Sequence, residues 1–434
     1  MDGAVTRKPE TAPPTAPSNR TRRLVLVMLG LVSMFNYIDR TVLSILQEPI
    51  KRELGLSDAQ LGMLTGLAFA LFYATLSLPI ARLADRLNRR NIVTASLAVW
   101  SGMTALTGLA TGFATLVAFR IGVALGEAGS VPASHSMIAD YYPPETRVTA
   151  LALWGLALPA GIMLGYASGG WIAATLGWRT AFAVIGGAGL ILAPFMLLLV
   201  KEPMRGAFNK PQQAAERIPL GAAIATLWRL RTYRYMLAGT TLHAFAQYAI
   251  MNWTAPFYMR VHHMPLSEVA GWLALMNGIG GGIGIYLGGW LSDRMARSDP
   301  AARVWVSAVA MFVMVPAALV QFLVPSPGLS LAFGFVATML MFFYYGPIVG
   351  VPQSLVAPRM RALTSAVTLL VFNLFGLGLG PAVTGFISDR LAAGGGMHDT
   401  SLRYALAVVL VFSLVGALSI AWASRFYRSE IRES

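Results

Sequence analysis

The chain has 434 residues, of which 56% are apolar and only 12% are charged, and its formal net charge is +14. The charged share is about half of that in soluble domains, so the composition argues against a soluble protein. Because the chain contains no cysteine, disulfides, thiolate nucleophiles and cysteine-ligated metals are excluded.

Residues 1–22 are rich in Pro, Thr and Ala, and we expect them to form a disordered cytoplasmic tail. The apolar run after Arg23 is too long for a signal-peptide core and ends without a small-residue cleavage site, so we expect it to remain as a membrane span. Eleven further runs are also long enough to cross a bilayer. The twelve predicted spans are 24–47, 60–81, 91–111, 113–139, 148–172, 180–200, 235–258, 270–291, 304–324, 329–356, 363–388 and 403–424.

The basic residues are distributed unequally between the two sides of these spans. With a cytoplasmic N-terminus, most of them fall in cytoplasmic segments, and the opposite side has only Lys51, Arg52, Arg179, Arg260, Arg390 and Arg403. This positive-inside pattern predicts that both termini lie in the cytoplasm. The positive charge is thereby explained by topology, and no nucleic-acid partner is expected.

The longest polar interruption, at residues 202–231, separates six spans from six. Three short motifs recur in the same order in the two halves, at offsets of 208, 222 and 224 residues: Ala81–Arg90 as Gly289–Arg297, Leu158–Gly161 as Gly380–Val383, and Arg179–Phe182 as Arg403–Leu406. Parallel repeats of this kind can enclose a cavity between two bundles. We therefore predict an all-α membrane protein with twelve transmembrane helices in two pseudo-symmetric six-helix bundles. Its predicted parts are the tail 1–22, the N-terminal bundle 23–201, the cytoplasmic linker 202–231, the C-terminal bundle 232–427 and the cytoplasmic tail 428–434.

Four ionisable residues fall inside predicted spans: Asp39 and Arg40 in the first, and Arg120 and Glu127 in the fourth. A charge in mid-membrane costs at least ~2.5 kcal/mol, so such residues usually face a protein interior or a water-filled path. Arg120 and Glu127 are seven residues apart, which places them on one helix face ~10.5 Å from each other. That distance is too long for a direct ion pair, and Asp39 is the natural partner from a neighbouring helix.

Asp39 and Arg40 are adjacent, so their side chains project ~100° apart and cannot point the same way. We expect Asp39 to pair with Arg120, and Arg40 to face the cavity, where a guanidinium can bind phosphate or carboxylate through two donors. Burial favours the protonated form of a carboxyl group and a nearby arginine opposes it. Asp39, Glu127 and Arg120 are therefore predicted to carry proton coupling. The alternative is a fixed salt bridge that only guides helix packing.

The segment Ala81–Arg90 resembles the G-x-x-x-D-R-x-G-R-R signature of the major facilitator superfamily, and the similarity to this superfamily extends over residues 22–427. The signature is matched at Leu83, Asp85, Arg86, Arg89 and Arg90, whereas Ala81 and Asn88 replace its usual glycines. The resemblance implies a monomeric transporter, multi-pass in a bacterial-type inner (plasma) membrane. It also implies that these charges, with partners on nearby helices, gate the transporter. The predicted gating residues are Asp85, Arg86, Arg89, Arg90, Asp140, Glu145, Arg147, Asp293 and Arg294; a purely topological role is the alternative for Arg89 and Arg90.

The motif Asn36–Arg40, taken together with Gly126–Ala128 and Asp140–Arg147, resembles the Spinster branch of this superfamily. That branch includes transporters of sphingolipids and lysophospholipids, which implies proton-coupled, alternating-access transport of an amphipathic lipid such as a lysophospholipid or a sphingoid phosphate. Carriers of organic anions and hexuronates share the first motif, so proton symport of a small organic anion is the alternative. A lateral apolar opening would favour the lipid, and an enclosed polar pocket the anion. The predicted substrate-binding residues are Asn36, Tyr37, Arg40, Glu127, Tyr248 and Asn373.

Other classes of function lack their motifs in this sequence. There is no Gly-x-Ser-x-Gly elbow or paired His–Asp metal motif, so an enzyme is not expected. There is no Walker-type loop either, so ATP is not the expected energy source. We expect the proton gradient to drive transport without a cofactor or a metal.

Overall fold

The computed structural model of the protein describes residues 18–84, 86–206, 208, 220–357, 360–395 and 399–433. Within these ranges the regular elements are helices, and no strand occurs. The first half of the chain contains α1 (Asn19–Leu54), α2 (Asp58–Gly62), η1 (Met63–Leu67), α3 (Ala68–Ala84), α4 (Arg89–Thr107), α5 (Phe113–Glu127), α6 (Ser130–Tyr141), α7 (Pro144–Gly155), α8 (Ala157–Leu176) and α9 (Trp178–Leu199). The second half contains α10 (Leu220–Arg229), α11 (Arg231–Val261), α12 (Leu266–Ala274), η2 (Leu275–Gly280), α13 (Gly281–Ala296), α14 (Ala302–Leu323), α15 (Pro327–Met341), α16 (Tyr345–Ser354), α17 (Arg361–Val371), η4 (Phe372–Leu379), α18 (Gly380–Gly395) and α19 (Ser401–Glu433).

Local sequence sets several helix ends. Ser18 caps α1, because its hydroxyl accepts a hydrogen bond from the amide of Thr21 at 3.2 Å. The same helix ends at Gly55, whose φ of 64° lies in the left-handed region that favours glycine. Asn88 caps α4 by accepting the amide of Asn91 at 3.0 Å. With φ at −65°, position 88 does not require the glycine of the signature, and asparagine supplies a cap instead.

Two predicted boundaries are wrong, because the terminal helices extend beyond their apolar runs. The helix α1 begins at Asn19, so residues 19–22 are helical, and α19 continues to Glu433 through most of the predicted tail 428–434. The predicted linker contains α10. The remaining tail residues 1–17, and linker residues 207 and 209–219, lie outside the described part of the chain.

Ten helical stretches among the described residues are long and apolar enough to cross a membrane. They coincide with ten of the twelve predicted spans. The third and seventh predicted spans correspond to α4 and α11, which have 19 and 31 residues. These two helices are less apolar, and α11 carries His243, Gln247 and Asn252. The protein is therefore an all-helical membrane protein.

Several spans are interrupted near their middle. The π-helical segments η1, η2 and η4 lie inside three of them, and α7 and α8 meet at Leu156. A π-helical segment distorts the regular hydrogen-bond ladder and is frequent at functional sites. All three segments face the other half of the chain, because η1 packs against η4 and η2 packs against α8. The three π-helical segments therefore lie on the surfaces along which the halves meet.

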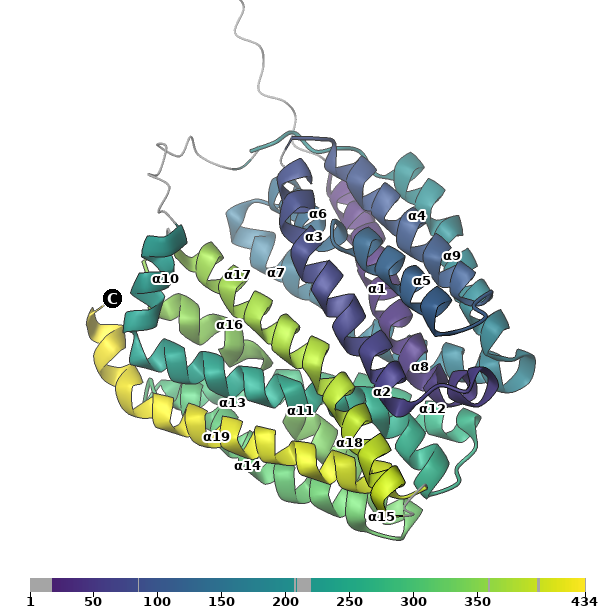
Figure 1. Cartoon of the computed structure of the whole chain (residues 1–434). Coiled ribbons are helices and arrows are strands. Elements are labelled where there is room, and N and C mark those ends of the chain that lie inside the picture. The colour runs from purple at the N-terminus through teal and green to yellow at the C-terminus, as the bar shows by residue number, and fades with distance from the viewer. Residues whose placement is uncertain are drawn as a thin grey trace, which may run out of the picture.

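The two halves of the chain meet along three sets of helices. α1 packs against α11, α8 packs against α12 and η2, and α2 with η1 packs against α18 and η4. In Figure 1 the halves converge around α2, α12 and α18 and diverge toward α7, α16 and α17. We call the converging side the distal side, and the opposite side, where α1 begins and α19 ends, the terminal side. The halves are thus in closer contact on the distal side.

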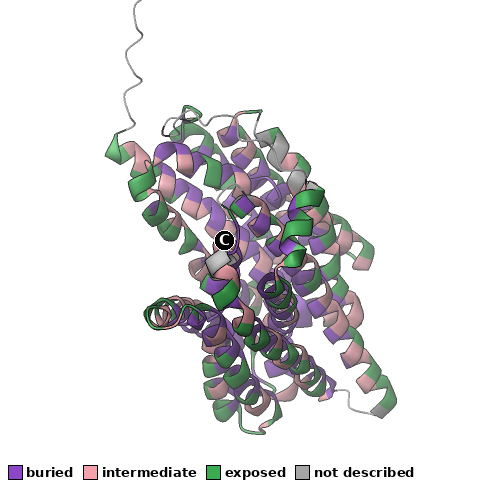
Figure 2. Cartoon of the chain, turned by 90° about the vertical axis from the view of Figure 1, so that its left-hand side faces the viewer, coloured by how far each residue is buried: buried purple, intermediate pink, exposed green. Residues whose placement is uncertain are grey.

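The surface is unusually apolar for a folded chain. Buried residues lie mainly on the inward faces of the helices, and exposed residues lie on the outer surface (Figure 2). Large apolar side chains are among the exposed ones, including Leu198 at 77% and Val148 at 76% exposure. A lipid bilayer would cover such side chains, as the number and length of the helices also require.

Candidate functional site

A cavity lies between the two halves, near the middle of α1 and α11. Counted with the open solvent at its mouth, it holds about 680 Å³ of empty space. Its wall is mostly apolar and aromatic, with a few polar groups. Among its lining residues are Arg40, Phe69, Arg120, Leu158 and Ile162 from the first half, and Gln247, Asn252, Met251, Phe342 and Leu377 from the second.

Arg40 and Glu127 form an ion pair at the edge of this cavity. The Nε and Nη2 atoms of Arg40 lie 2.8 and 2.7 Å from the same carboxylate oxygen, Oε2 of Glu127. The side chain of Glu127 is completely buried, whereas that of Arg40 is 22% exposed. The other oxygen, Oε1 of Glu127, is buried and has no hydrogen-bond partner among the described residues. The guanidinium is therefore the member of the pair that a molecule in the cavity would reach.

A second ion pair involves the neighbouring residue of α1. Nη1 of Arg120 lies 3.4 Å from Oδ2 of Asp39, and the hydroxyl of Thr104 on α4 donates to the other oxygen of Asp39. Asp39 and Arg120 are both buried. The structure thus brings together the two residues whose pairing the helix spacing favours, while their role in proton coupling remains a prediction.

An aromatic ring links the two ion pairs. The guanidinium carbons of Arg120 and Arg40 lie 4.4 and 4.8 Å from the ring centre of Phe69, and Arg40 also lies 5.1 Å from the ring of Tyr73. Such rings attract cations through their electron-rich faces. With the two carboxylates included, the four charges sum to zero. An arriving anion or proton would therefore disturb a balanced group.

The other predicted substrate-binding residues are spread more widely. Tyr37 and Tyr248 line the cavity. Asn36 is buried, and its Nδ2 atom has no hydrogen-bond partner among the described residues. Asn373 lies on η4, one turn before the lining residue Leu377, and is not itself a lining residue in this conformation.

Arg89 is the centre of a polar cluster on the terminal side. Its Nη1 atom lies 2.5 Å from Asp140 and its Nε atom 2.8 Å from Glu202, and Nη1 also donates to the hydroxyl of Ser136 at 2.8 Å. The side chain of Arg89 is only 3% exposed. All three partners belong to the first half, so in this conformation Arg89 connects α4, α6 and the segment after α9.

The other predicted gating residues of the first half that the structure describes do not reach the second half either. Arg90 hydrogen-bonds to the side chain of the adjacent Asn91, and Arg147 donates to the carbonyl of Ala139 at 2.8 Å. Arg86 and Glu145 are exposed, and no ion pair involves them within the described ranges. Asp85 lies outside the described residues.

The second half repeats this arrangement more loosely. Asp293 on α13 lies 3.5 Å from Arg303 on α14, and both side chains are solvent-exposed. Arg294 lies 5.4 Å from the ring centre of Trp290 on its own helix. Both contacts stay within the second half, so the role of these residues as a gate remains a prediction.

A charged cluster on the distal side was missed by the sequence analysis. Glu48, Lys51, Asp58 and Arg260 form ion pairs there, and Asp389 hydrogen-bonds to backbone amides of α2. The predicted first span ended at 47 and the seventh at 258, whereas α1 and α11 continue to Leu54 and Val261. Glu48 and Arg260 therefore lie on helices. From the sequence, Arg260 was assigned only a topological role as a basic residue outside the spans. Acidic residues beside basic ones at a span end were the signal that could have revealed the cluster.

No metal centre is formed by the described residues, since no group of three or more His, Asp or Glu side chains is placed to hold an ion. His243, which stands alone in its span, is fully buried, and its ring nitrogens lie 2.7 Å from the Ser413 hydroxyl and 3.1 Å from the carbonyl of Met341. It is therefore a packed histidine with two neutral partners.

Comparison with known proteins gives a consistent result. Residues 29–381 match the family model of the Major Facilitator Superfamily. The chain is 34% identical over 406 residues to an MFS-type efflux pump of Mycolicibacterium smegmatis, covering 94% of this chain and 93% of that protein. It is 25% identical to protein spinster homolog 1 of Xenopus tropicalis, covering 93% of this chain and 80% of the relative.

A solved structure agrees with the fold over almost the whole chain. It is a crystal structure of a bacterial homologue of the human lysosomal transporter Spinster, in an inward-facing and unoccupied conformation. Its TM-score is 0.87 at 32% identity, with 95% of this chain and 99% of that chain covered. The chain therefore belongs to the Major Facilitator Superfamily, a family of transporters and not of enzymes, and within it is similar to the Spinster proteins.

Proposed function

We propose that this protein is a proton-coupled secondary transporter that moves an amphipathic lipid of the lysophospholipid or sphingoid phosphate type by alternating access. The observation that carries the proposal is the position of Arg40, a partly exposed cation in the wall of a cavity lined mainly by apolar and aromatic side chains. A phosphate head group would bind the guanidinium. The lipid tail would lie against Leu158, Ile162 and Leu377.

Coupling follows from competition for Arg40. Both of its donors to Glu127 converge on one carboxylate oxygen, so a substrate anion that takes these donors leaves Glu127 without its cation. A buried carboxylate that loses its partner carries a large free-energy penalty, and a proton removes that penalty. Substrate binding at Arg40 and protonation of Glu127 would then occur together.

Asp39 and Arg120 would carry the second part of the same switch. Arg120 and Arg40 both contact the ring of Phe69, so a change in the charge of Glu127 alters the field at both guanidiniums. Asp39 would then hold or release Arg120 as the cavity opens to one side of the membrane and closes to the other. Every charge of this switch lies in the first half of the chain.

The arrangement in the membrane is part of the proposal. We assign twelve spans in two six-helix bundles, with α4 and α11 as the two less apolar ones, and both termini in the cytoplasm of a bacterial-type inner membrane. The terminal side would then be cytoplasmic. The halves are more widely separated on this side, and we interpret this separation as an inward-open state. The inward-facing conformation of the solved Spinster homologue supports this interpretation. A monomer is sufficient for this mechanism because both halves belong to one chain.

Transport by the purified protein in liposomes tests the proposal. A pH gradient is imposed, and uptake is followed for a panel of lysophospholipids, sphingoid phosphates and small organic acids such as hexuronates. We expect uptake of one or more of the lipids, driven by the gradient and abolished by Arg40→Gln. The matched control is Arg425→Gln, which removes an exposed arginine on the terminal part of α19 and should leave uptake unchanged.

Two results would refute parts of the proposal separately. Uptake of the organic acids alone would establish the small-anion alternative, in which the same guanidinium binds a carboxylate. Lipid transport that is indifferent to the pH gradient would exclude proton coupling and leave the lipid assignment standing.

A further inference from the structure

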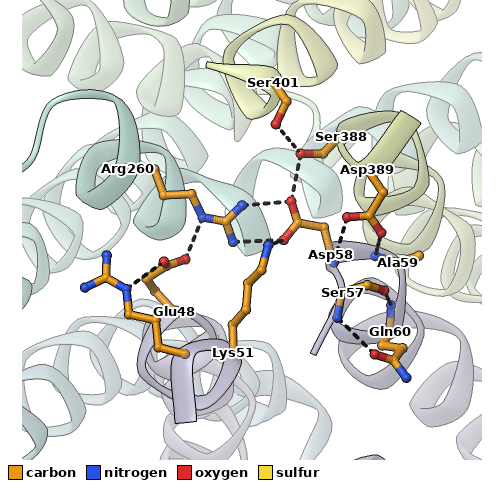
Figure 3. Close-up of polar contacts among 11 residues, drawn as sticks. Glu48, Lys51, Ser57, Asp58, Ala59, Gln60, Arg260, Ser388, Asp389 and Ser401 are labelled. Atoms are coloured by element: carbon orange, nitrogen blue, oxygen red, sulfur yellow. Dashed lines mark hydrogen bonds and ion pairs between the residues drawn. The ribbon is translucent and has the colours of Figure 1, made fainter. Parts of the chain in front are cut away.

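The charged residues on the distal side form one connected group that we call the distal cluster: Glu48, Lys51, Asp58, Arg260, Ser388 and Asp389 (Figure 3). Glu48, Lys51 and Asp58 come from the first half of the chain, and the other three from the second. The cluster therefore lies across the boundary between the halves. It is separate from the Arg40 site, because Glu48 lies about two turns after Arg40 on α1.

Asp58 is the most highly connected member of the distal cluster. Its two oxygens accept hydrogen bonds from Arg260 at 2.7 and 2.9 Å, from Lys51 at 2.5 Å and from Ser388 at 2.7 Å. Arg260 also reaches Glu48 at 2.6 Å through its Nε atom. Arg260 thus connects α11 to two carboxylates of the other half with charge-assisted hydrogen bonds, which are about twice as strong as neutral ones.

Asp389 makes a different kind of contact between the halves. Its two carboxylate oxygens accept the backbone amides of Asp58 and Ala59 at 3.0 and 2.8 Å. These amides open α2, which continues through η1 and α3 to Ala84, so Asp389 caps a helix of the opposite half. Ser57 caps the same helix from within, in a capping box with Gln60. The internal cap would remain in place if Asp389 were withdrawn.

Two other helices have comparable caps that stay within one half. Glu202 accepts the amide of Arg90 at the start of α4 at 2.9 Å. Glu430 accepts the amides of Arg231 and Thr232 at the start of α11, at 2.7 and 3.0 Å. Among these three carboxylate caps of the described helices, only that of Asp389 connects the two halves.

Alternating access requires contacts that close one side of the fold, and under the proposed function the distal cluster supplies these contacts as a gate on the distal side. We propose that Asp389 is a removable helix cap within this gate, whose withdrawal from α2 accompanies the opening of the distal side. The inference rests on the alternating access of the proposed function but not on its substrate or on protons. It assigns to Asp389 and to the amides of α2 a role in setting how often the distal side is open.

The surroundings of the cluster allow these contacts to break reversibly. A cavity lined by Lys51, Asp58, Arg260 and Asp389 holds about 900 Å³ of empty space when the open solvent at its mouth is included. Charges separated beside such a cavity are hydrated at once, which lowers the cost of breaking the pairs compared with a dry interior. Between the gate and the Arg40 site, Ser44 and Gln47 contact Asn252 across the same boundary.

The absence of cysteine from the chain permits a direct test with a single introduced thiol. Ala270 of α12 is 2% exposed and packs against Gly170 of α8, so it is buried between the halves on the distal side. In an Ala270→Cys background, the purified protein in lipid nanodiscs is treated with a hydrophilic maleimide, without substrate or pH gradient. Thr111→Cys, at an exposed position in the distal loop after α4, gives the reference rate of a thiol that is always accessible.

We expect Asp389→Ala to accelerate labelling at position 270 about fivefold, the population factor that corresponds to the ~1 kcal/mol typical of a helix cap. Asp389→Asn keeps one acceptor oxygen without the charge and should give a smaller increase. Glu430→Ala removes a cap of the same kind from within one half and should leave the rate unchanged.

Two results would overturn the inference. One is unchanged labelling in both Asp389 variants while the protein remains monodisperse and folded. The other is an equal increase in Glu430→Ala, which would mean that losing any cap loosens the protein. Because the assay contains no substrate and no gradient, its result is independent of whether the transported molecule is a lipid.

Discussion

Glu127 gives only one of its two carboxylate oxygens to Arg40, and the other is buried without a hydrogen-bond partner among the described residues. A fixed structural salt bridge would be expected to use both oxygens, since bidentate pairing is the stronger geometry. The free oxygen is a position at which a proton could be held while Arg40 binds another anion. The geometry of this pair therefore favours exchange over permanent attachment.

The first prediction concerns Glu127→Gln, which mimics a protonated side chain. We expect the variant to bind substrate with undiminished affinity, because the amide leaves Arg40 available to the head group. Transport should lose its dependence on the pH gradient, because no proton is taken up at position 127. Binding measured by scintillation proximity and uptake measured at several gradients would check the two parts. A variant whose uptake still follows the gradient would remove Glu127 from the coupling mechanism.

The second prediction concerns Arg40→Lys, which keeps the charge but removes the fork of donors. A lysine ammonium is a compact charge that cannot reproduce the paired donors of Nε and Nη2. We expect substrate affinity to fall at least ~10-fold, the factor that corresponds to the ~1.5 kcal/mol of one charge-assisted hydrogen bond. Equilibrium binding of substrate to the purified variant measures this change in affinity. An affinity within twofold of the unmodified protein would show that Arg40 acts only as a point charge.

The sequence was sufficient to predict the pairing of Asp39 with Arg120, and this success has a simple physical basis. Charged residues inside apolar spans must find partners within the protein, and helical periodicity limits which faces they occupy. The same reasoning did not predict which cation meets Glu127. The long side chain of Arg40 reaches Glu127. The directions in which side chains leave the helix predicted only that Arg40 faces the substrate cavity.

The distal cluster could not be derived from the sequence in this way. Its residues lie at the ends of spans, where charges are common and are explained by topology. Asp58 and Asp389 are 331 residues apart, and their contact depends on how the two halves pack in one conformation.

The third prediction concerns the terminal cluster around Arg89. Arg89→Ala would leave Asp140 buried without its cation, a loss that costs 3–5 kcal/mol for fully buried pairs. Glu202 is 22% exposed and can be rehydrated, so we expect the lower figure of ~3 kcal/mol in the free energy of unfolding. Thermal unfolding in detergent would detect it as a clear fall in Tm.

Arg90→Ala is the matched control, because it removes the neighbouring arginine from the same helix. The side chain of Arg90 hydrogen-bonds mainly to the adjacent Asn91, so its loss should cost no more than ~0.5 kcal/mol. Equal destabilisation by both substitutions would mean that the positive charge of this segment, and not the buried contacts of Arg89, stabilises the terminal side.

The last prediction concerns the close contact of η1 with η4. A Cβ atom at Gly66 would lie 2.6 Å from the carbonyl oxygen of Gly378 and 2.9 Å from that of Leu377, and backbone atoms cannot move aside as a flexible side chain can. Gly66→Ala should therefore oppose the conformation in which the halves meet on the distal side, although alanine is otherwise the better helix former by ~1 kcal/mol. Labelling of the thiol in the Ala270→Cys background should become faster. Gly30→Ala on α1 is the control, because no atom lies within 4 Å of a Cβ at that position. If both alanine variants were labelled at the unmodified rate, the contact between η1 and η4 would not limit the opening of the distal side.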